Sequence, residues 1–398
     1  MEVIFIGGLF PEKLKADIEK KSKGTIDYAA DTLQKALIKG LDFFTTQLKI
    51  INLPFLSIYP FYSDFRLKSF HFSHNDLAND INVGFLNLPI IKKVSRYLKT
   101  KAELFRSIKK GNEIILIYSL HTPFIKAAVD LKSKYPSIKV CVIVPDLMQF
   151  TSEESRWRPL RYINSKEQFL LERLLEKVDS FVVLSDFMYK PLRIGKRPWT
   201  RVEGIFIDAA VDRLENKESL KTVLYSGTLA KRYGILELLD AFAELKDEGY
   251  RLWICGNGDC REELIRRANT DRRIIYWGQL PREKVLQLQK RAMVLVNPRT
   301  SKGEFTKYSF PSKIMEYLGS GTPTILHRLP GVPDEYYQYV FVPDNETSEA
   351  LKRSIMEVCK KSNMELQRFG DLAKKFVKDY KTPYVQCEKV YKMISDSI

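Results

Sequence analysis

Short runs of apolar, mostly β-branched residues alternate with amphipathic helical patterns along the whole chain. Strands that are apolar along their whole length belong to parallel sheets covered by helices on both faces. Because parallel strands need helical crossovers between them, this alternation predicts a doubly wound α/β architecture. The predicted strands are residues 3–7, 113–119, 140–144, 180–185, 222–227, 251–256, 273–278, 293–297 and 322–326.

The length of the chain predicts two such domains. At 398 residues it exceeds the size at which a single hydrophobic core usually stops growing. Residues 194–200, IGKRPWT, combine glycine, proline and basic residues, which is the composition of an interdomain linker. We therefore expect one domain over residues 1–197, a second over residues 198–374, and a separate C-terminal helical segment over residues 375–398.

The formal net charge of +16 predicts an anionic partner. Charge alone allows nucleic acid, an anionic membrane face or a phosphorylated small molecule. The sequence contains no recognisable nucleic-acid reader module, so no nucleic-acid partner is expected. Basic residues are concentrated in residues 92–110 and again in residues 156–162, RWRPLRY.

Residues 92–110 have the pattern of a basic amphipathic helix, which suits the surface of an anionic membrane. A helix face that is merely solvated is the alternative. The residues available for an apolar stripe are Val94, Leu98, Leu104, Phe105 and Ile108.

Cysteine usage and the N-terminus favour a cytoplasmic protein. The five cysteines are odd in number and lack a paired metal-binding spacing, which is typical of free thiols. The N-terminus begins with an apolar run and a double glycine, without a basic leader. The uncharged run at residues 50–63 is interrupted by two prolines and is shorter than the roughly 20 residues that span a bilayer. We expect a cytoplasmic or peripheral membrane protein.

The residues that follow the predicted strands are the first candidates for a functional site. In open α/β sheets, ligands bind beyond the carboxyl ends of the strands. The candidates at these positions are Gly7, Gly8, His121, Pro145, Asp146, residues 227–232, Gly256, Asn257, Gly258, Gly278 and residues 297–299.

Residues 307–326, KYSFPSKIMEYLGSGTPTIL, predict a loop, a helix and a buried strand. Pro311 is expected at the first helical position, and Gly319 and Gly321 close the helix. The free amide groups at such a helix start attract an anion such as phosphate. Glu316, one turn further, is suited to accept hydrogen bonds from the hydroxyl groups of a sugar. An ordinary capped helix followed by a strand remains the alternative.

The order of the motifs resembles glycosyltransferase family 4. IGGLFP, SDF after SFVVL, SGTLAKRYGILELLDAF, LWICGNGD, IYWGQLPREKV, MVLVNPR and SFPSKIMEYLGSGTPTI follow one another as in that family. The resemblance covers most of residues 200–326 and, more loosely, residues 1–190. It implies the GT-B fold, in which two Rossmann-like domains face each other across a cleft and a C-terminal helix crosses back to the first domain. It is closest to cytoplasmic enzymes that assemble bacterial surface polysaccharides.

The resemblance implies that Glu316 is the second acidic residue of the family's paired-glutamate motif, which holds the ribose of the nucleotide. Tyr308 stands where the first glutamate is expected. Glu304, four residues earlier, is the nearest carboxylate on that side. Either residue is a candidate for the missing contact to the donor sugar.

Two further departures from the family concern charged positions. Thr228 stands where the family often has arginine, so the resemblance assigns the diphosphate to Lys231 and Arg232. Asp146 follows a proline where the family usually has histidine, and His121 is the only histidine at a predicted strand end. The expected catalytic residues are Lys231, Arg232, Glu316, Asp146 and His121.

The residues expected to bind the donor come from the same motifs. They are Gly7, Gly8, Gly227, Thr228, Gly256, Asn257, Gly258, Gly278, Leu280, Arg299, Glu304, Tyr308, Ser309, Phe310, Pro311, Ser312 and Lys313.

No metal or other cofactor is expected. The chain contains no Asp-x-Asp pair, and no carboxylate or cysteine set accompanies His71 and His74. Positive side chains and a helix dipole must then stabilise the leaving diphosphate. The resemblance implies transfer with retention at the anomeric carbon, from a UDP-sugar to a glycan or a polyprenyl-diphosphate-linked acceptor. A catalytically silent partner subunit and a sugar-nucleotide 2-epimerase are the alternatives.

Overall fold

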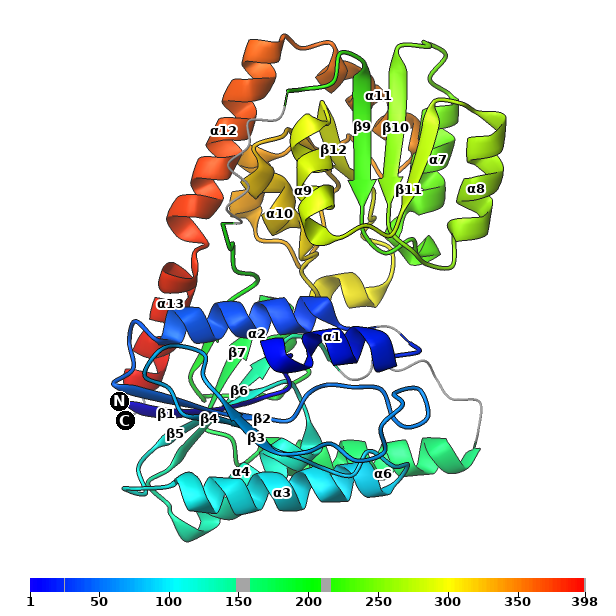
Figure 1. Cartoon of the computed structure of the whole chain (residues 1–398). Helices are drawn as coiled ribbons and strands as arrows, with labels where there is room; N and C mark the ends of the chain where they lie inside the picture. Colours follow the sequence, from blue (N-terminus) through cyan, green and yellow to red (C-terminus); the bar gives the residue numbers. More distant parts are fainter. Residues whose placement is uncertain (25, 148–157, 209–215, 397–398) are drawn as a thin grey trace. The chain divides into compact units, whose positions relative to one another are not determined.

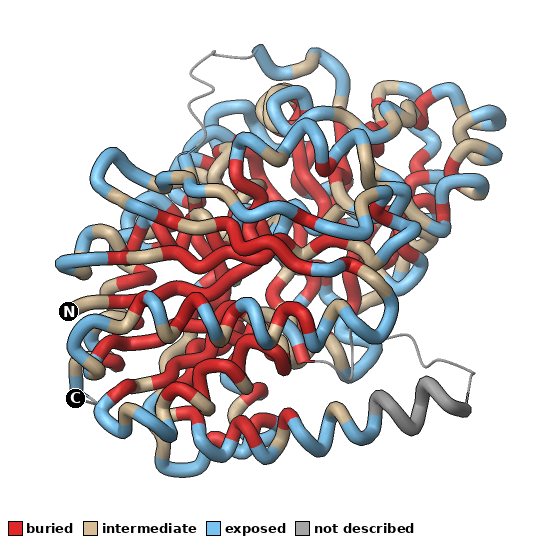
Figure 2. Tube along the Cα trace, turned by 60° about the horizontal axis from the view of Figure 1, so that its bottom comes forward, coloured by how far each residue is buried: buried red, intermediate tan, exposed pale blue. Residues whose placement is uncertain are grey.

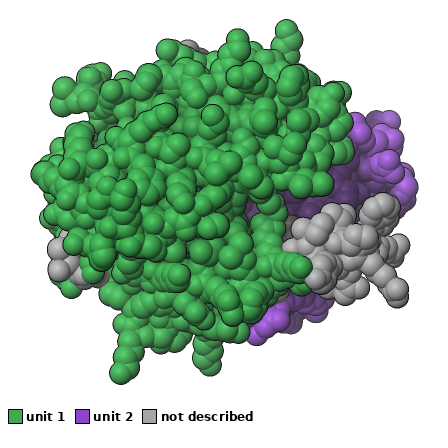
Figure 3. All heavy atoms as spheres, turned by 90° about the horizontal axis from the view of Figure 1, so that it is seen from below, with its two compact units in different colours: residues 1–205, 383–398 green, residues 206–382 purple. Residues whose placement is uncertain are grey.

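The chain forms two compact α/β units. The computed structural model describes residues 1–24, 26–147, 158–208 and 216–396, and in residues 158–164 the backbone alone. Unit 1 comprises residues 1–205 and 383–398, and unit 2 comprises residues 206–382. Figure 3 colours the two units separately.

Unit 1 is built on one eight-stranded sheet in the order β3-β4-β2-β1-β5-β6-β7-β8. All neighbouring strands are parallel except β3, which runs antiparallel to β4. The strands are β1 (Glu2–Gly7), β2 (Gln47–Asn52), β3 (Phe70–Phe72), β4 (Asp80–Asn82), β5 (Ile114–Tyr118), β6 (Lys139–Val144), β7 (Ser180–Val183) and β8 (Trp199–Arg201).

Helices cover both faces of this sheet (Figure 1). On one face α3 packs on α4, and α4 packs on α6; on the other face α2 packs on α13. The central strands are buried, while the outer sides of the helices are exposed (Figure 2). The helices are α1 (Glu12–Lys21), α2 (Tyr28–Leu41), α3 (Ile91–Ser107), α4 (Thr122–Lys134), α6 (Arg158–Leu175) and α13 (Pro383–Ser395).

Unit 2 has a fully parallel five-stranded sheet in the order β11-β10-β9-β12-β13. Its strands are β9 (Lys221–Ser226), β10 (Tyr250–Cys255), β11 (Ile274–Gly278), β12 (Val294–Asn297) and β13 (Thr324–Leu326). Its helices are α7 (Ile235–Ala243), α8 (Arg261–Thr270), α9 (Arg282–Arg291), α10 (Lys313–Ser320), α11 (Ser348–Cys359) and α12 (Asn363–Tyr380), with 3₁₀ turns η2 (Lys231–Tyr233), η3 (Glu304–Tyr308) and η4 (Asp334–Tyr339).

The alternation of side chains along β9 explains why both faces of this sheet are covered. Val223 and Tyr225 belong to a cluster that includes residues of α7, α8 and α11. Leu224, which points to the opposite face, packs in a second cluster with Leu288 of α9 and Tyr317 of α10. A strand apolar on both faces is therefore stable only between two helical layers, as the sequence pattern predicts.

Each strand expected from the apolar runs is present, but the expected linker is wrong. Trp199 and Thr200, inside residues 194–200, belong to β8 and pair with β7. Aromatic and β-branched residues favour a strand once a sheet edge is available to pair with, and this outweighs the glycine and proline nearby. The units meet along the chain at Ile205 and Phe206.

The C-terminal segment also begins later than expected. Helix α12 continues through residues 374 and 375 to Tyr380 and belongs to unit 2. The segment that returns to unit 1 is residues 383–398, with α13 starting at Pro383. Cys387, Val390 and Ile394 of α13 are buried in unit 1.

Candidate functional site

The loops at the carboxyl end of the unit 2 sheet pack backbone against backbone. Gly256 follows β10 with φ +142°, and a Cβ atom there would lie 1.8 Å from the carbonyl oxygen of Gly227. A Cβ on Gly258 would lie 2.5 Å from the carbonyl oxygen of Leu229. These glycines allow the loops after β9 and β10 to approach each other, which fixes the base on which the site is built.

Helix α10 is anchored to the end of β9 by Tyr317. Its hydroxyl accepts a hydrogen bond from the amide of Ser226 at 2.8 Å and donates one to the Ser226 carbonyl oxygen at 3.2 Å. Tyr317 is fully buried, so the rotation of α10 about its axis is fixed. Glu316, the preceding residue, is thereby placed close to the carboxyl end of β9.

Glu316 lies among two cations and an amide. Its Oε2 is 2.6 Å from Lys313 Nζ and 3.5 Å from Gln289 Nε2, and its Oε1 is 3.7 Å from Arg282 Nε. The side chain keeps 22% of its surface exposed, so a ligand can still reach it. Arg282 and Gln289 were not among the residues expected from the sequence.

Burial raises the pKa of Glu316, but the charge and hydrogen bond of Lys313, the charge of Arg282 and the amide of Gln289 outweigh it, and the pKa is lowered overall. The carboxylate is therefore ionised at neutral pH. In this form it can only accept hydrogen bonds, which suits it to hydroxyl donors rather than to anions.

Two arginines flank a pair of aromatic rings near the ends of β9 and β12. Arg299 is 7% exposed and donates to Ser309 Oγ at 2.8 Å. Its guanidinium lies 5.1 Å from the ring centre of Tyr233 and 4.6 Å from that of Phe305. Arg232, which is exposed, lies over the same rings at 5.2 and 5.6 Å. The stack thus holds one buried and one accessible positive charge.

Lys231 is exposed at the start of η2, and its amide donates to Asp259 Oδ1 at 3.1 Å. Across the residues that the structure describes, neither Lys231 nor Arg232 forms an ion pair with a carboxylate. Their positive charges therefore remain available to an anionic ligand. Gly234, with φ +78°, ends this turn directly before α7.

Tyr308 and Glu304 interact with each other at the two ends of η3. Burial, followed by the charge of Glu304 and a hydrogen bond to it, raises the pKa of the Tyr308 hydroxyl. Glu304 also lies 3.9 Å from Lys307 Nζ. The two candidates for the missing first glutamate therefore interact directly with each other.

Helix α10 begins two residues later than expected, at Lys313. Pro311 is not the first helical residue, because it precedes the N-cap residue Ser312. The Pro311 carbonyl accepts a hydrogen bond from the Ile314 amide at 2.9 Å. The turn before the helix is thus stabilised by its own backbone, and Ser312 is exposed at the helix start.

The other residues of unit 2 that were expected to bind the donor sugar nucleotide form hydrogen bonds within the loops or pack in the core. The Thr228 carbonyl accepts from Tyr225, the Asn257 carbonyl accepts from Leu229, and the Gly278 carbonyl accepts from Gly256. Leu280 packs against the cluster around Trp253. Phe310 is buried, with its ring centre 5.2 Å from that of Tyr336, so its side chain belongs to the core.

Four expected site residues lie in unit 1. The side chain of Gln34 accepts a hydrogen bond from the Gly8 amide at 2.8 Å, and a Cβ on Gly7 would meet the same oxygen. His121 follows β5 at the start of α4, and Asp146 is exposed after β6. Gly7 and Gly8 therefore belong to a different unit from the other expected donor residues.

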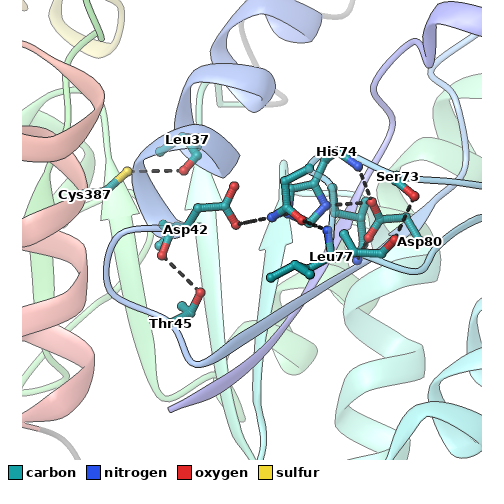
Figure 4. A network of polar contacts seen from close by, with 12 residues as sticks. Leu37, Asp42, Thr45, Ser73, His74, Leu77, Asp80 and Cys387 are labelled. Atoms are coloured by element: carbon teal, nitrogen blue, oxygen red, sulfur yellow. Dashed lines mark hydrogen bonds and ion pairs between the residues drawn. The ribbon is translucent and has the colours of Figure 1, made fainter.

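The described residues contain no group of three or more histidine, cysteine or acidic side chains arranged to hold a metal ion. His74 instead joins two carboxylates: its Nδ1 is 2.6 Å from Asp80 Oδ2 and its Nε2 is 3.0 Å from Asp42 Oδ1 (Figure 4). This network ties the loop around His74 to the ends of α2 and β4.

Comparisons with known proteins bear on the family and the fold of the chain. Residues 207–376 match the family model of glycosyl transferases group 1. None of the curated proteins compared with the chain by sequence matches it. Among solved structures, sucrose-phosphate synthase from Thermosynechococcus elongatus is similar over 100% of both chains, with a TM-score of 0.66 and 15% identity.

Two other solved structures are similar over 100% of both chains. The lipopolysaccharide outer core galactosyltransferase WaaB, in its apo form, has a TM-score of 0.65 and 12% identity. Anabaena HepE, solved in complex with UDP, has a TM-score of 0.63 and 11% identity. At these identities the likeness concerns the fold, which is the two-domain GT-B arrangement of Rossmann-like units, and within it residues 207–376 match the model of glycosyl transferases group 1.

Proposed function

We propose that the chain is a retaining, metal-independent glycosyltransferase that uses a UDP-sugar. The observation that carries the proposal is the ionised, accessible Glu316 between Lys313 and Arg282, inside the stretch that matches a glycosyltransferase family model. Unit 2 then binds the donor and unit 1 binds the acceptor. Glu316 accepts hydrogen bonds from the ribose hydroxyls, each of which contributes roughly 1.5–3 kcal/mol because the acceptor is charged.

The donor diphosphate gains negative charge as the glycosidic bond breaks. In the proposed mechanism Lys231 and Arg232 hold this group together with the start of α10, where Lys313 and the helix dipole add positive charge. Preorganised donors of this kind typically lose about 10²–10³ in rate when one is removed. They stabilise the leaving group in the transition state more than in the ground state, which is what accelerates the transfer.

Retention follows in this proposal from attack on the face that the diphosphate leaves. A double displacement needs a carboxylate nucleophile close to a second acid. Glu316 is already surrounded by Lys313, Arg282 and Gln289, which suits ribose binding rather than nucleophilic attack. The departing phosphate then accepts the proton of the acceptor, and Asp146 and His121 of unit 1 contact the acceptor.

We further propose that the acceptor is a glycan or a polyprenyl-diphosphate-linked sugar in surface polysaccharide synthesis, reached at the cytoplasmic face of a membrane. Helix α3 differs from an ordinary surface helix, because apolar side chains lie on its exposed side and mostly polar side chains lie on its buried side. Val94 and Leu98 are 55% and 56% exposed. The buried residues of α3 are Ser95, Arg96, Thr100, Glu103, Leu104 and Ser107.

Leu104 was expected in the same apolar stripe as Val94 and Leu98, but it is buried. The exposed large apolar residues of α3 are Ile91, Val94 and Leu98. Exposed Lys93, Lys99 and Arg106 on the same helix add positive charge. Ser95 on the inner side binds a polar group of unit 1, because its hydroxyl accepts a hydrogen bond from the amide of Leu86 at 3.0 Å. An apolar stripe flanked by cations suits an anionic leaflet.

The second basic segment, RWRPLRY, lies outside the residues whose side chains the structure describes. Residues 156–157 lie outside the described residues, and so do the side chains of residues 158–162. No helix within the described residues is long and apolar enough to cross a membrane.

The test is a thermal-shift titration of the purified chain with UDP, GDP, ADP and a panel of their sugars, followed by transfer assays. UDP at about 100 times its dissociation constant should stabilise unit 2 by roughly 2.7 kcal/mol. Lys231→Ala should lose most of the transfer, whereas Lys246→Ala, an exposed lysine before β10, should not.

Normal transfer by both Lys231→Ala and Glu316→Ala would refute the proposed site. UDP binding without transfer or donor hydrolysis would instead favour a silent partner subunit, for which Tyr308 in place of a glutamate is the motivating observation. A C2-inverted sugar among the products would favour the epimerase.

A further inference from the structure

The inner side of α3 carries a buried positive charge. Arg96 is 2% exposed, and its guanidinium donates to the carbonyl oxygen of Leu53 at 2.5 Å and of Pro54 at 3.4 Å. Its Nε atom is buried without a hydrogen-bond partner. The guanidinium also lies within 5.3 Å of the ring centres of Phe55, Phe85 and Phe124. Aromatic faces and carbonyl oxygens partly stabilise this cation, but they carry no formal charge.

Lys92, one turn earlier, adds a second cation at the same place. Its Nζ donates to the carbonyl oxygen of Leu56 at 2.5 Å. Burial, followed by the charge of Arg96, lowers the pKa of Lys92 to about 7. In the part of the chain that the structure describes, neither Lys92 nor Arg96 has a carboxylate partner. Burying positive charge without a counterion costs free energy, and a bound anion would recover it.

His121 borders this cluster from the start of α4. Its ring centre is 4.2 Å from that of Phe124 and 5.8 Å from that of Phe55, the rings that Arg96 also contacts. Nδ1 is buried without a partner. Burial, and then the charges of Arg96, Lys92 and Lys93, lower the pKa of His121 well below its usual value. A neutral imidazole has one N–H group, and it can donate this hydrogen to an anion.

The neighbouring charges leave the cluster positive. Glu167 of α6 is bound by Lys93 and by Thr122 Oγ1, the latter at 3.3 Å. When Lys92 and Arg96 are charged, they and Lys93 supply three positive charges, and Glu167 supplies one negative charge. The cluster then carries an excess of two positive charges. Asp27, Asp31 and Asp146 raise the pKa of the nearby Tyr118, whereas the charges that lower the pKa of His121 are those of Arg96, Lys92 and Lys93.

We propose that unit 1 binds a phosphate or diphosphate group through Lys92 and His121, with Arg96 as a fixed positive charge behind them. The excess of two charges matches a dianion better than a single carboxylate. The site lies at the carboxyl ends of β2 and β5, the edge where ligands of open α/β sheets bind. This inference rests on the proposed function in one respect, namely that the group belongs to the acceptor of glycosyl transfer.

The test uses the histidine NMR signals of the full chain, which has only four histidines. With UDP present at saturation, inorganic phosphate is titrated, and the His121 signal is assigned through His121→Asn. Phosphate should shift the His121 signal saturably and leave the His327 signal of unit 2 unchanged. It should also raise the melting temperature of unit 1.

Substitutions on α3 separate a ligand role from a structural role. Lys92→Gln should weaken phosphate binding by about tenfold or more, because a charge-assisted hydrogen bond is lost. Lys92→Arg should restore part of it. Lys99→Gln, which removes the same charge from the exposed side of α3, is the control and should bind as the parent does. If Lys92→Gln lowers the melting temperature equally with and without phosphate, Lys92 is structural and the proposal fails.

Two further probes identify the source of the group. Geranyl diphosphate that shifts the His121 signal at least as strongly as inorganic pyrophosphate supports a lipid-linked acceptor. Binding of pyrophosphate alone supports a free anion in the same site. No response of His121 to any of the three anions, in a sample that still binds UDP, overturns the anion site and leaves the proposed donor site standing. A sample that fails to bind UDP contradicts the proposed function instead.

Discussion

At the scale of single residues, the surroundings of a side chain decide what it can do. Glu316 and Glu304 are both glutamates near α10, but Glu316 is held between Lys313 and Arg282, whereas Glu304 is exposed and bound to Tyr308. The sequence could single out Glu316 because local start and stop signals delimit its helix and place it one turn inside. It could not reveal Arg282, which starts a helix far away in the sequence and reaches Glu316 through the packing of α9 on α10.

The role of Glu316 can be measured by its amide variant. Glu316→Gln keeps the shape but replaces a charged acceptor with a neutral group, so UDP binding should weaken by roughly 10- to 100-fold. Calorimetric titration with UDP checks this. Glu304→Gln, whose carboxylate is on the exposed turn, is the matched control and should lose much less. Equal losses in the two variants would contradict a special role for Glu316.

His74 should make the stability of unit 1 depend on pH. Burial lowers its pKa, but the hydrogen bonds and charges of Asp80 and Asp42 outweigh burial and raise it above 6.5. Because the folded pKa is the higher one, the protonated ring stabilises the fold fully below pH 6.5, and this contribution is lost as pH rises through the folded pKa.

Calorimetric unfolding of the parent and of His74→Asn at several pH values measures this contribution. The stability difference between the two proteins should be largest in acid and shrink above neutral pH. His71→Asn, on the same hairpin, serves as the control. A difference that does not change with pH would contradict the ionic network around His74.

At the scale of elements, α3 shows that the spacing of apolar residues does not by itself decide which side of a helix is buried. Val94 and Leu98 of the predicted stripe lie on the exposed side of the helix, whereas Leu104, also part of that stripe, is buried. Val94 and Leu98 face outwards, while the inner side carries Arg96, which donates to the loop after β2, and Glu103, which binds Lys49 of β2. Helical periodicity fixes which residues share a face but not which face is buried.

Removing the exposed stripe should change membrane binding without changing stability. The double substitution Val94→Ser and Leu98→Ser should reduce binding to vesicles that contain anionic lipid by several fold, because apolar contact is lost. Sedimentation with vesicles measures this, and high salt should weaken binding of the parent. The matched control is Met364→Ser, because Met364 is an apolar residue of unit 2 that is 80% exposed. Unchanged vesicle binding of the double variant would rule out this face.

At the scale of the whole molecule, the chain builds unit 1 from its two ends. Helix α13 packs on α2, and the Cys387 thiol donates to the carbonyl oxygen of Leu37 at 3.3 Å. A Cβ on Gly40 would lie 2.3 Å from the carbonyl oxygen of Pro383, so the two helices approach each other closely. Unit 2 is a continuous stretch of the chain between these parts.

Truncation after Thr382 should therefore destabilise unit 1 selectively. It exposes the face of α2 that Cys387, Val390 and Ile394 cover, and losing buried apolar groups of this size costs several kcal/mol. Hydrogen exchange should show faster exchange in α2, while the strands of unit 2 keep their protection. Removal of residues 397–398 alone is the control. Equal loss of protection in both units would contradict the division of the chain.

By itself, the sequence determined the class of fold, the strands that are apolar on both faces, and the loop-to-helix segment that carries Glu316. These features are local, because they depend on the spacing of apolar residues and on turn residues within a few positions. The tertiary structure decided that residues 199–201 extend the first sheet and that α3 faces outwards with its apolar side. It also brought Arg282 to Glu316, and His121 to the rings that enclose Arg96. Strand pairing, helix orientation and contacts between distant side chains depend on which surfaces meet, and spacing along the chain does not determine that.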